Sequence, residues 1–384
     1  MTLVVVGASL AGLRAVESAR RTGYRGRIVL VGAEEHLPYD RPPLSKAFLD
    51  AGGPSRVEPF HPEAVLRDDL GVELVLGAPA ESLDTGAREV AVAGTAVRYD
   101  ALVIATGATA RRLPGARTLR TAEDAVAVRA ALDAGARTVV IGAGFIGSEV
   151  ASAARRRGLP VTIVEASAVP LARAVGETAG ARLIALHHAA GTELRLATEV
   201  TGVAGDGVHL AGGEVLPADL VVAGIGAVPA TGWLEGSGLT LHERDRGVVC
   251  DATLAAGPPG VYAAGDVAHV PNPLFDGLGV RLEHWTNAAE QGAAAARHAL
   301  DPASARPLEA VPYFWSDWYG RRIQFVGTPH ADEVVSAGGV TLYRRGDRLA
   351  GALTVDRPRE IMKYRRRVAA RSPWTEALAF AGAA

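Results

Sequence analysis

The chain has 384 residues, which is more than one compact domain usually holds, so two or three domains are expected. Hydrophobic residues make up 48% and charged residues 21% of it, as in ordinary globular proteins, and 40 basic residues stand against 42 acidic ones. This balance gives no indication of nucleic-acid binding. The longest uncharged run, residues 220–234, is shorter than the roughly 18 apolar residues of a membrane-spanning helix. Because the chain starts without a basic leader or a cleavage site, a cytoplasmic, non-membrane protein is expected.

The cysteine content excludes several kinds of redox site. Cys250 is the only cysteine, so the chain can form no internal disulfide, no CxxC pair and no four-thiolate iron–sulfur cluster. A cysteine-rich zinc site is excluded for the same reason, and no metal site is predicted. Any redox chemistry of this chain would therefore use a bound organic cofactor.

Two stretches of the chain carry the pattern of a βαβ unit, in which a strand, an amphipathic helix and a second strand follow one another. The first unit has its strands at residues 2–7 and 28–31, and the second has them at 138–141 and 161–164. Two such units in one chain indicate nucleotide binding more strongly than one does.

The second unit contains a complete dinucleotide-binding fingerprint. Gly142 makes the tight turn, Gly144 lets the backbone approach a pyrophosphate, and Gly147 lets the helix pack closely on the strand. The phosphates would bind at the helix N-terminus, where free N–H groups and the helix dipole stabilise negative charge. Glu165 ends the next strand, where a carboxylate accepts hydrogen bonds from a ribose and repels a 2′-phosphate, so NADH is predicted over NADPH.

The first unit is less regular. Gly7, Ser9 and Gly12 occupy the fingerprint positions, with serine in place of the middle glycine. The acid that would bind the ribose is Glu34 or Glu35, and the spacing does not decide between them.

The remaining segments predict further elements. Helices are expected at residues 121–136 and at about 288–300, and a linker at 301–307, which contains two prolines. Residues 311–371 alternate strand-like segments with turns and predict a small α+β domain.

Seven motifs then appear in the order that one family shows: PYDRPPLSK, ATGA, GAGFIG, GIGAVP, AAGDVA, EHWTNAAEQG and FWSDWYG. Because it carries these motifs in this order, the chain resembles, over nearly its whole length, the FAD-dependent ferredoxin reductases of the oxygenase-coupled, putidaredoxin reductase type. The resemblance implies an α/β fold of the glutathione reductase kind, with two Rossmann-like dinucleotide-binding domains and a small α+β C-terminal domain. The implied segments are an FAD-binding domain at 1–108 and 229–303, an NAD-binding domain at 109–228 and an interface domain at 304–384.

The resemblance also assigns site residues. FAD would be bound by Gly7, Ser9, Ala11, Gly12, Glu34, Arg41, Lys46, Ala80, Arg120, Asp266 and Trp285. NADH would be bound by Gly142, Gly144, Gly147, Glu165 and Arg173. Lys46 beside flavin N5 and Glu149 facing it are the predicted catalytic residues. Trp318 stands where related reductases usually have a polar residue, and no role is predicted for it.

Simpler interpretations of the catalytic pair stay open. Lys46 could be a surface residue of a helix that starts after two prolines. Glu149 could serve only to stabilise the first turn of its helix through the helix dipole.

The implied reaction passes electrons from NADH through FAD to a small [2Fe–2S] ferredoxin that serves an oxygenase, and the protein would be a monomer or a weak homodimer. Residues 341–371 hold ten basic and three acidic side chains, and this basic segment is the predicted docking face for an acidic ferredoxin. A rubredoxin reductase or an NADH-binding flavoprotein of the apoptosis-inducing-factor type is the alternative. A disulfide or peroxide reductase is disfavoured, because Ser45 precedes Lys46 where such enzymes need a cysteine near the flavin.

Overall fold

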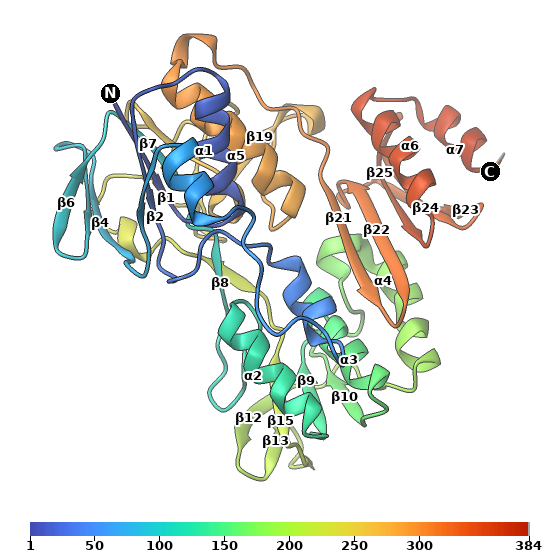
Figure 1. The fold of residues 1–384 in the computed structure, drawn as a ribbon. Coiled ribbons are helices and arrows are strands. Elements are labelled where there is room, and N and C mark those ends of the chain that lie inside the picture. The colour runs from blue at the N-terminus through green and yellow to red at the C-terminus, as the bar shows by residue number, and fades with distance from the viewer. Residues whose placement is uncertain (383–384) are drawn as a thin grey trace. The chain divides into compact units, whose positions relative to one another are not determined.

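The computed structural model describes residues 1–382, which divide into two compact units (Figure 1). Unit 1 comprises Met1–Asp40, Glu58–Thr109 and Val228–Pro312. Unit 2 comprises Arg41–Val57, Ala110–Ala227 and residues 313–382. The finer division into FAD-binding, NAD-binding and interface segments stays a prediction.

Unit 1 is built on a five-stranded parallel sheet with the strand order β18-β7-β1-β2-β3. Its strands are β1 (Thr2–Val6), β2 (Arg27–Val31), β3 (Val72–Val75), β7 (Ala101–Ile104) and β18 (Val261–Ala263). The central strands consist almost wholly of buried Val, Leu and Ile, the composition expected where helices cover both faces of a parallel sheet. The first predicted βαβ unit is confirmed.

Helices α1 (Leu10–Arg21) and α5 (Trp285–Leu300) lie side by side in unit 1 (Figure 1). The contact is close because Gly292 has no side chain: a Cβ there would come within 2.1 Å of the Ala11 carbonyl oxygen. Helix α5 starts at Trp285, three residues before the predicted start. The residues of this first turn are polar or aromatic, so the apolar spacing does not mark it.

Two small sheets complete unit 1. The first is antiparallel and consists of β4 (Ala80–Asp84), β5 (Glu89–Val92) and β6 (Thr95–Arg98). The second is mixed: β19 (Ala268–Asn272) pairs in parallel with β17 (Val248–Val249) and antiparallel with β20 (Leu278–Arg281).

Unit 2 contains a second parallel sheet, of the order β11-β10-β9-β15. Its strands and helices are β9 (Thr138–Ile141), β10 (Val161–Val164), β11 (Glu193–Arg195), β15 (Leu220–Ala223), α2 (Ala122–Asp133), α3 (Phe145–Arg156) and α4 (Ala172–Ala189). Strands β12 (Val200–Ala204), β13 (Gly207–Leu210) and β14 (Val215–Leu216) form a separate antiparallel sheet. The second predicted βαβ unit, β9-α3-β10, is confirmed.

The C-terminal part of unit 2 is a five-stranded antiparallel sheet of the order β21-β22-β25-β24-β23, followed by two helices. The elements are β21 (Tyr313–Trp318), β22 (Arg321–Gly327), β23 (Glu333–Ala337), β24 (Val340–Arg345), β25 (Arg348–Val355), α6 (Pro358–Ala369) and α7 (Trp374–Gly382). The predicted fold class is therefore confirmed: two parallel sheets of the Rossmann kind and a small α+β part at the C-terminus. Among residues 1–382, no helix is long and apolar enough to cross a bilayer.

Candidate active site

The first fingerprint loop lies where β1 meets α1. Gly7 has a φ of +121°, and a Cβ on it would come within 2.1 Å of the Ala105 carbonyl oxygen. A Cβ on Gly12 would come within 1.9 Å of the Gly7 carbonyl oxygen. Only glycine fits either position, so strand and helix approach each other closely and leave the helix N-terminus open at the sheet edge.

Both fingerprint helices present N-termini suited to an anion. Neither α1 nor α3 has an acidic residue in its first turn, and neither Ser9 nor Gly144 makes a side-chain capping bond. By contrast, α2 carries a complete capping box, in which Thr121 and Asp124 each accept a backbone N–H. The first-turn N–H groups of α1 and α3 are thus available to phosphate oxygens.

The structure brings Asp266 to the N-terminus of α1. Asp266 lies in a short turn (Gly265–Val267), and a Cβ on Gly265 would come within 3.2 Å of the Ala11 Cβ. The Gly265 N–H donates to Gln291 Oε1 of α5 at 2.8 Å, which ties the turn to that helix. Asp266 and Ala11, which were predicted to bind the same cofactor, are therefore neighbours.

Trp285 and Glu34 also belong to unit 1. The Trp285 indole N–H, in the first turn of α5, donates to Asp40 Oδ1 at 2.8 Å. Glu34 accepts a hydrogen bond from the Tyr39 hydroxyl at 2.7 Å and is half-buried, whereas Glu35 is exposed. Ala80 begins strand β4.

In unit 2, the three glycines of the second fingerprint differ in how closely other atoms pack against them. A Cβ on Gly142, which has a φ of +98°, would come within 2.5 Å of the Gly224 carbonyl oxygen, and one on Gly147 within 2.1 Å of the Gly142 oxygen. At Gly144 the nearest atom would lie at 3.5 Å, an ordinary contact. Packing therefore does not require glycine at this position, and its missing side chain leaves room for a ligand.

Glu165 reaches back to this loop. Its Oε2 accepts the Ala143 N–H and its Oε1 accepts the Ser167 N–H, both at 2.8 Å. The carboxylate is thus fixed beside the fingerprint turn, as the ribose interpretation requires. Arg173 is exposed at the start of α4.

Arg41 and Arg120, both predicted to bind FAD, meet within unit 2. The Arg41 guanidinium donates to the Arg120 carbonyl oxygen at 2.7 Å. The Arg120 N–H in turn donates to Asp124 Oδ2 at 2.8 Å, so the α2 capping box also holds this backbone.

The predicted catalytic pair forms a buried ion pair. The Lys46 ammonium lies 2.9 Å from each oxygen of Glu149, and the two side chains are 20% and 2% exposed. Lys46 directly follows a 3₁₀ turn (Pro42–Ser45), and Glu149 lies in the second turn of α3. The pair excludes the interpretation of Lys46 as a solvated surface residue.

Two serines that the sequence analysis left without a role complete this cluster. The hydroxyls of Ser45 and Ser316 both donate to the Glu149 carboxylate, one to each oxygen. Both lie in motifs that carry the resemblance, PPLSK and FWSDWYG, and this was the only signal that could have pointed to them. Lys46, Ser45 and Ser316 all act as hydrogen-bond donors to the carboxylate.

His187 lies in the same part of unit 2 and is fully buried. Burial, and to a lesser extent His188, lowers its pKa to about 4. Since the unfolded chain takes up this proton near pH 6.5, stability is fully present above that pH and is lost as the pH falls toward 4. We expect a loss of about 2 kcal/mol of unfolding free energy between pH 7 and pH 5 from this residue. Denaturant melts at both pH values should show a smaller loss for His187→Gln; an equal loss would contradict the assignment.

The single cysteine has the wrong environment for redox chemistry. Cys250 is buried in unit 1, and burial, followed by the charge of Asp251, raises its pKa to about 12. Its thiol donates to the Val248 carbonyl oxygen at 3.5 Å. A thiol that does not ionise near neutral pH is neither a nucleophile nor an electron carrier.

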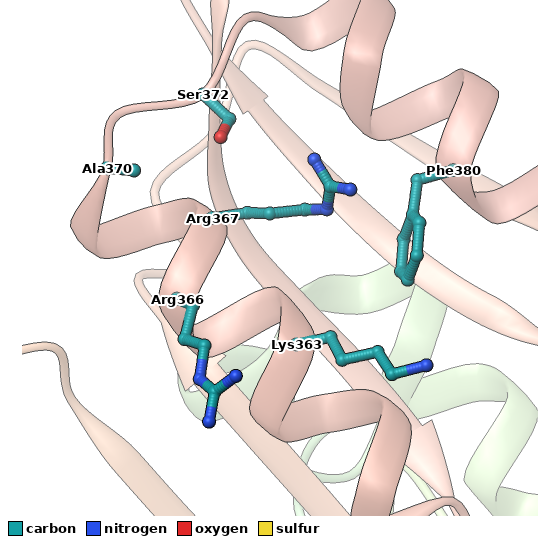
Figure 2. A pocket seen from close by; sticks show the side chains of 6 residues that line it. All are labelled: Lys363, Arg366, Arg367, Ala370, Ser372 and Phe380. Atoms are coloured by element: carbon teal, nitrogen blue, oxygen red, sulfur yellow. The ribbon is translucent and has the colours of Figure 1, made fainter.

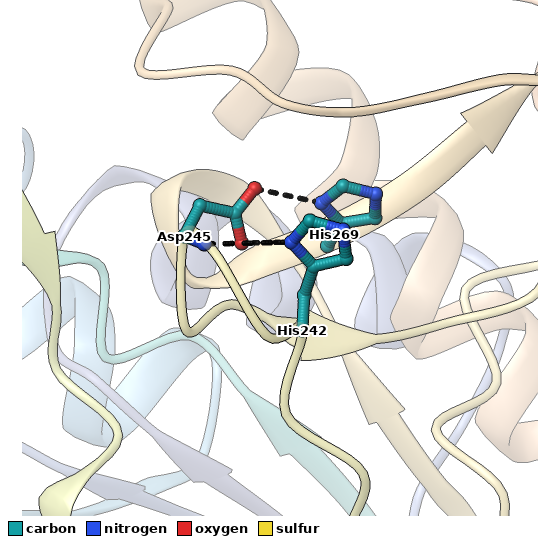
Figure 3. A group of neighbouring side chains, drawn as sticks. All are labelled: His242, Asp245 and His269. Carbon is teal, nitrogen blue, oxygen red and sulfur yellow. Dashed lines mark hydrogen bonds and ion pairs between the residues drawn. The ribbon is translucent and has the colours of Figure 1, made fainter.

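Unit 1 also contains a cluster of His242, Asp245 and His269 (Figure 3). Asp245 accepts from His269 Nδ1 at 2.8 Å and lies 3.2 Å from His242 Nδ1. The two imidazoles are stacked, with centroids 3.9 Å apart and planes 13° from parallel. Since a metal ion binds in the plane of an imidazole, two parallel stacked rings cannot both direct Nδ1 at one ion. The cluster is a hydrogen-bonded link between β19 and the loop that precedes β17.

Comparisons with known proteins agree with this geometry. The family described as pyridine nucleotide-disulphide oxidoreductase matches residues 1–292, and the family described as reductase C-terminal matches residues 313–382. The chain belongs to the pyridine nucleotide-disulphide oxidoreductase family. It is thus an oxidoreductase, and this family implies FAD and NADH as its cofactors. It cannot form the disulphide of the family name, because Cys250 is its single cysteine.

Relatives within this family bear the names that the motifs predicted. Rhodocoxin reductase of Rhodococcus erythropolis is 38% identical, with 98% of this chain and 91% of the relative covered. The ferredoxin–NAD(+) reductase subunit of a benzene 1,2-dioxygenase system of Pseudomonas putida is 36% identical, with 96% and 92% covered. A rubredoxin–NAD(+) reductase of Pseudomonas putida is 37% identical, with 85% and 86% covered. The predicted resemblance is confirmed.

Solved structures agree as well. A chain of the covalent putidaredoxin reductase–putidaredoxin complex superposes with a TM-score of 0.89 at 33% identity, with 97% of this chain and 94% of that chain covered. The glutathione reductase type of architecture, predicted from the motifs, therefore holds for this family member.

Proposed function

We propose that this protein takes two electrons from NADH onto FAD and passes them singly to a small [2Fe–2S] ferredoxin that serves an oxygenase. The observation that carries the proposal is the pair of glycine-lined helix N-termini, one on each parallel sheet, together with the buried Lys46–Glu149 pair. The names of the relatives support the choice of acceptor.

FAD fits unit 1. Its pyrophosphate would bind the uncapped N-terminus of α1 at Gly7, Ser9, Ala11 and Gly12, and Asp266 would accept hydrogen bonds from its ribityl chain. When bound, FAD accepts a hydride from NADH and can release the two electrons one at a time.

NADH fits the second fingerprint. The open position at Gly144 admits a pyrophosphate to the N-terminus of α3, and Glu165 would accept the adenosine ribose hydroxyls. Both of its oxygens already accept a backbone N–H, but each retains a lone pair for a hydroxyl.

Lys46 and Glu149 would support hydride transfer as a fixed pair of charges. The ammonium would supply a positive charge to stabilise a reduced flavin, and the carboxylate holds the ammonium in one position. Because Glu149 is 2% exposed and Lys46 20% exposed, water screens this pair only weakly, and the attraction between the two charges holds both side chains in place.

A cationic pocket in the C-terminal part of unit 2 supports docking of an acidic partner (Figure 2). It has a volume of about 350 Å³ and lies between α6 and α7, lined by Lys363, Arg366, Arg367, Ala370, Ser372 and Phe380. None of these six described residues is acidic. Three of the ten basic side chains of the basic segment line this pocket, whereas Arg344 and Arg357, elsewhere in the segment, are paired with Glu333 and Glu360.

The direct test is electron transfer by the purified protein. We expect one non-covalent FAD per chain and NADH-dependent reduction of a [2Fe–2S] ferredoxin. The absorption spectrum of the ferredoxin monitors the reaction, and ferricyanide serves as a small acceptor for comparison. A folded protein that takes up no FAD, or whose flavin NADH does not reduce, would contradict the proposal.

The docking face has its own expected result. Lys363→Glu with Arg366→Glu, two exposed positions, should lower ferredoxin-dependent turnover at low salt by about tenfold or more, since charge complementarity speeds encounter. Turnover of the unaltered protein should fall steeply from low to physiological salt, while ferricyanide reduction changes little.

The matched control is Arg25→Glu with Arg182→Glu, which makes the same charge change at exposed positions outside α6. If both double variants lose turnover equally, the effect comes from net charge and the pocket is not the docking face.

A rubredoxin is the second candidate acceptor, because a rubredoxin–NAD(+) reductase is among the relatives. Comparing kcat/KM for a rubredoxin and a ferredoxin in the same assay decides between them. The proposal also includes a cytoplasmic location and a monomeric or weakly dimeric state, which sedimentation at several concentrations would check.

A further inference from the structure

Trp318 is the last residue of β21 and is fully buried, which is rare for so large a side chain. Its indole N–H donates to Ser316 Oγ at 2.8 Å. Strand β21 alternates half-buried and buried side chains, so Ser316 and Trp318 lie on the same buried face, two residues apart. Ser316 in turn donates to the Glu149 carboxylate of α3.

The order of these bonds determines the direction of the Ser316 hydroxyl. An indole N–H can only donate, so it occupies a lone pair of Ser316 and cannot accept the serine proton. The serine proton is then directed at Glu149, which as a carboxylate only accepts. A hydroxyl whose oxygen accepts one hydrogen bond is also a better donor in the next, because the two bonds polarise each other.

The surroundings hold Trp318 in place. The His187 ring of α4 packs on it with centroids 5.0 Å apart, and His187 Nδ1 bonds the Tyr319 hydroxyl at 2.8 Å. The Tyr319 N–H donates to Ser152 Oγ of α3 at 3.0 Å. The indole is therefore anchored to the helix that carries Glu149.

The other polar groups around Glu149 do not interrupt its hydrogen bond from Ser316. Lys46 and Ser45 approach the carboxylate from the segment Arg41–Val57. The carboxylate of Asp317 is turned to Arg322, at 2.9 Å, and only its N–H reaches Glu149, at 3.4 Å.

We propose that Trp318 is a positioning residue for Glu149, acting through Ser316. Its N–H holds the serine hydroxyl on the carboxylate, and so fixes the carboxylate against Lys46. This inference rests on the proposed function for its kinetic consequence, while the hydrogen-bonded chain itself can be tested without NADH.

The kinetic test uses flavin reduction in the holoenzyme under single-turnover conditions. Trp318→Phe keeps a buried ring but removes the N–H, and should lower the limiting rate of reduction by NADH about three- to tenfold, the effect of one hydrogen bond. The NADH concentration at half-saturation should stay unchanged, because no NADH-binding residue is altered. Placing β-(3-benzothienyl)alanine at position 318, which replaces only the N–H by sulfur, should give the same loss.

A double-variant comparison separates positioning from general destabilisation. In a Ser316→Ala background, Trp318→Phe should cause no further loss of rate, since the chain is already broken. Phe325→Leu, in the same hydrophobic core, is the control and should lower stability without changing the limiting rate. Full-rate reduction in Trp318→Phe, or an equal further loss in the Ser316→Ala background, overturns the proposal.

The hydrogen-bonded chain has an independent readout. The protein has five tryptophans, and the indole ¹H–¹⁵N resonance that disappears in Trp318→Phe belongs to Trp318. This resonance should shift in Ser316→Ala and in Glu149→Gln. If the resonance shifts in neither variant, the hydrogen-bonded chain is refuted, whether or not NADH reduces the flavin. If the resonance shifts but NADH does not reduce the flavin, only the proposed function is refuted.

Discussion

Replacing Lys46 with methionine is expected to slow flavin reduction by NADH by about 10²-fold, the usual effect of removing one charged donor from a buried reaction site. The ammonium lies 2.9 Å from both oxygens of Glu149 and is 20% exposed, so methionine fills the space but removes the charge. Stopped-flow reduction at saturating NADH measures the effect, and the FAD content of the purified variant shows whether binding is retained. A rate equal to that of the unaltered protein would contradict the catalytic role.

The same substitution should also destabilise the fold, because it leaves a buried carboxylate without its countercharge, at a cost of about 3–5 kcal/mol. The double variant Lys46→Met with Glu149→Gln removes both charges and keeps hydrogen bonds to Ser45 and Ser316 possible. It should regain most of the stability while reduction stays slow. Recovery of the rate together with stability would show that the pair has only a structural role.

The second large effect concerns the choice between NADH and NADPH. We expect kcat/KM for NADH to exceed that for NADPH by about 10²-fold or more, since Glu165 would face the extra phosphate with a negative charge. In Glu165→Ala the ratio should fall by about tenfold or more, because NADH loses hydrogen bonds to its ribose and NADPH loses the repulsion of its phosphate. Loss of the bond that holds the fingerprint turn through Ala143 should lower kcat/KM for both nucleotides alike.

Glu193 provides the control for this variant. It is an exposed carboxylate on β11, the strand beside β10, and Glu193→Ala removes the same charge without touching the fingerprint loop. Steady-state kinetics with both nucleotides should leave its ratio unchanged. Equal kcat/KM values for NADH and NADPH in the unaltered protein would show that Glu165 does not bind the ribose.

Local patterns predicted the parts of the site that are built from adjacent residues. The two fingerprints lie at β1–α1 and β9–α3 because glycine spacing, strand and helix are all readable within about thirty residues. The glycines at 7 and 142 have the positive φ that such turns require. Family resemblance supplied Lys46 and Glu149, which no local pattern connects.

The partners of Glu149 were not predictable in the same way. Ser316 follows it by 167 residues and meets it because the C-terminal antiparallel sheet packs on α3, within unit 2. Nor could the pattern show that Trp318, in a strand, has its N–H directed at a serine two positions earlier. Such contacts depend on tertiary packing, which sequence spacing does not encode.

The strand order of unit 1 determines when its sheet can form. Strand β18 pairs with β7, although residues 105–260 separate them, whereas the four strands of the β11-β10-β9-β15 sheet lie within residues 138–223. During synthesis the second of these sheets can therefore close before the first is complete. Until residue 263 has emerged, β7 is an open edge that could pair with another nascent chain. Because of the order of segments along the polypeptide, completion of the unit 1 sheet is a late step of folding, and the chain is prone to aggregate through the edge of β7 until that step.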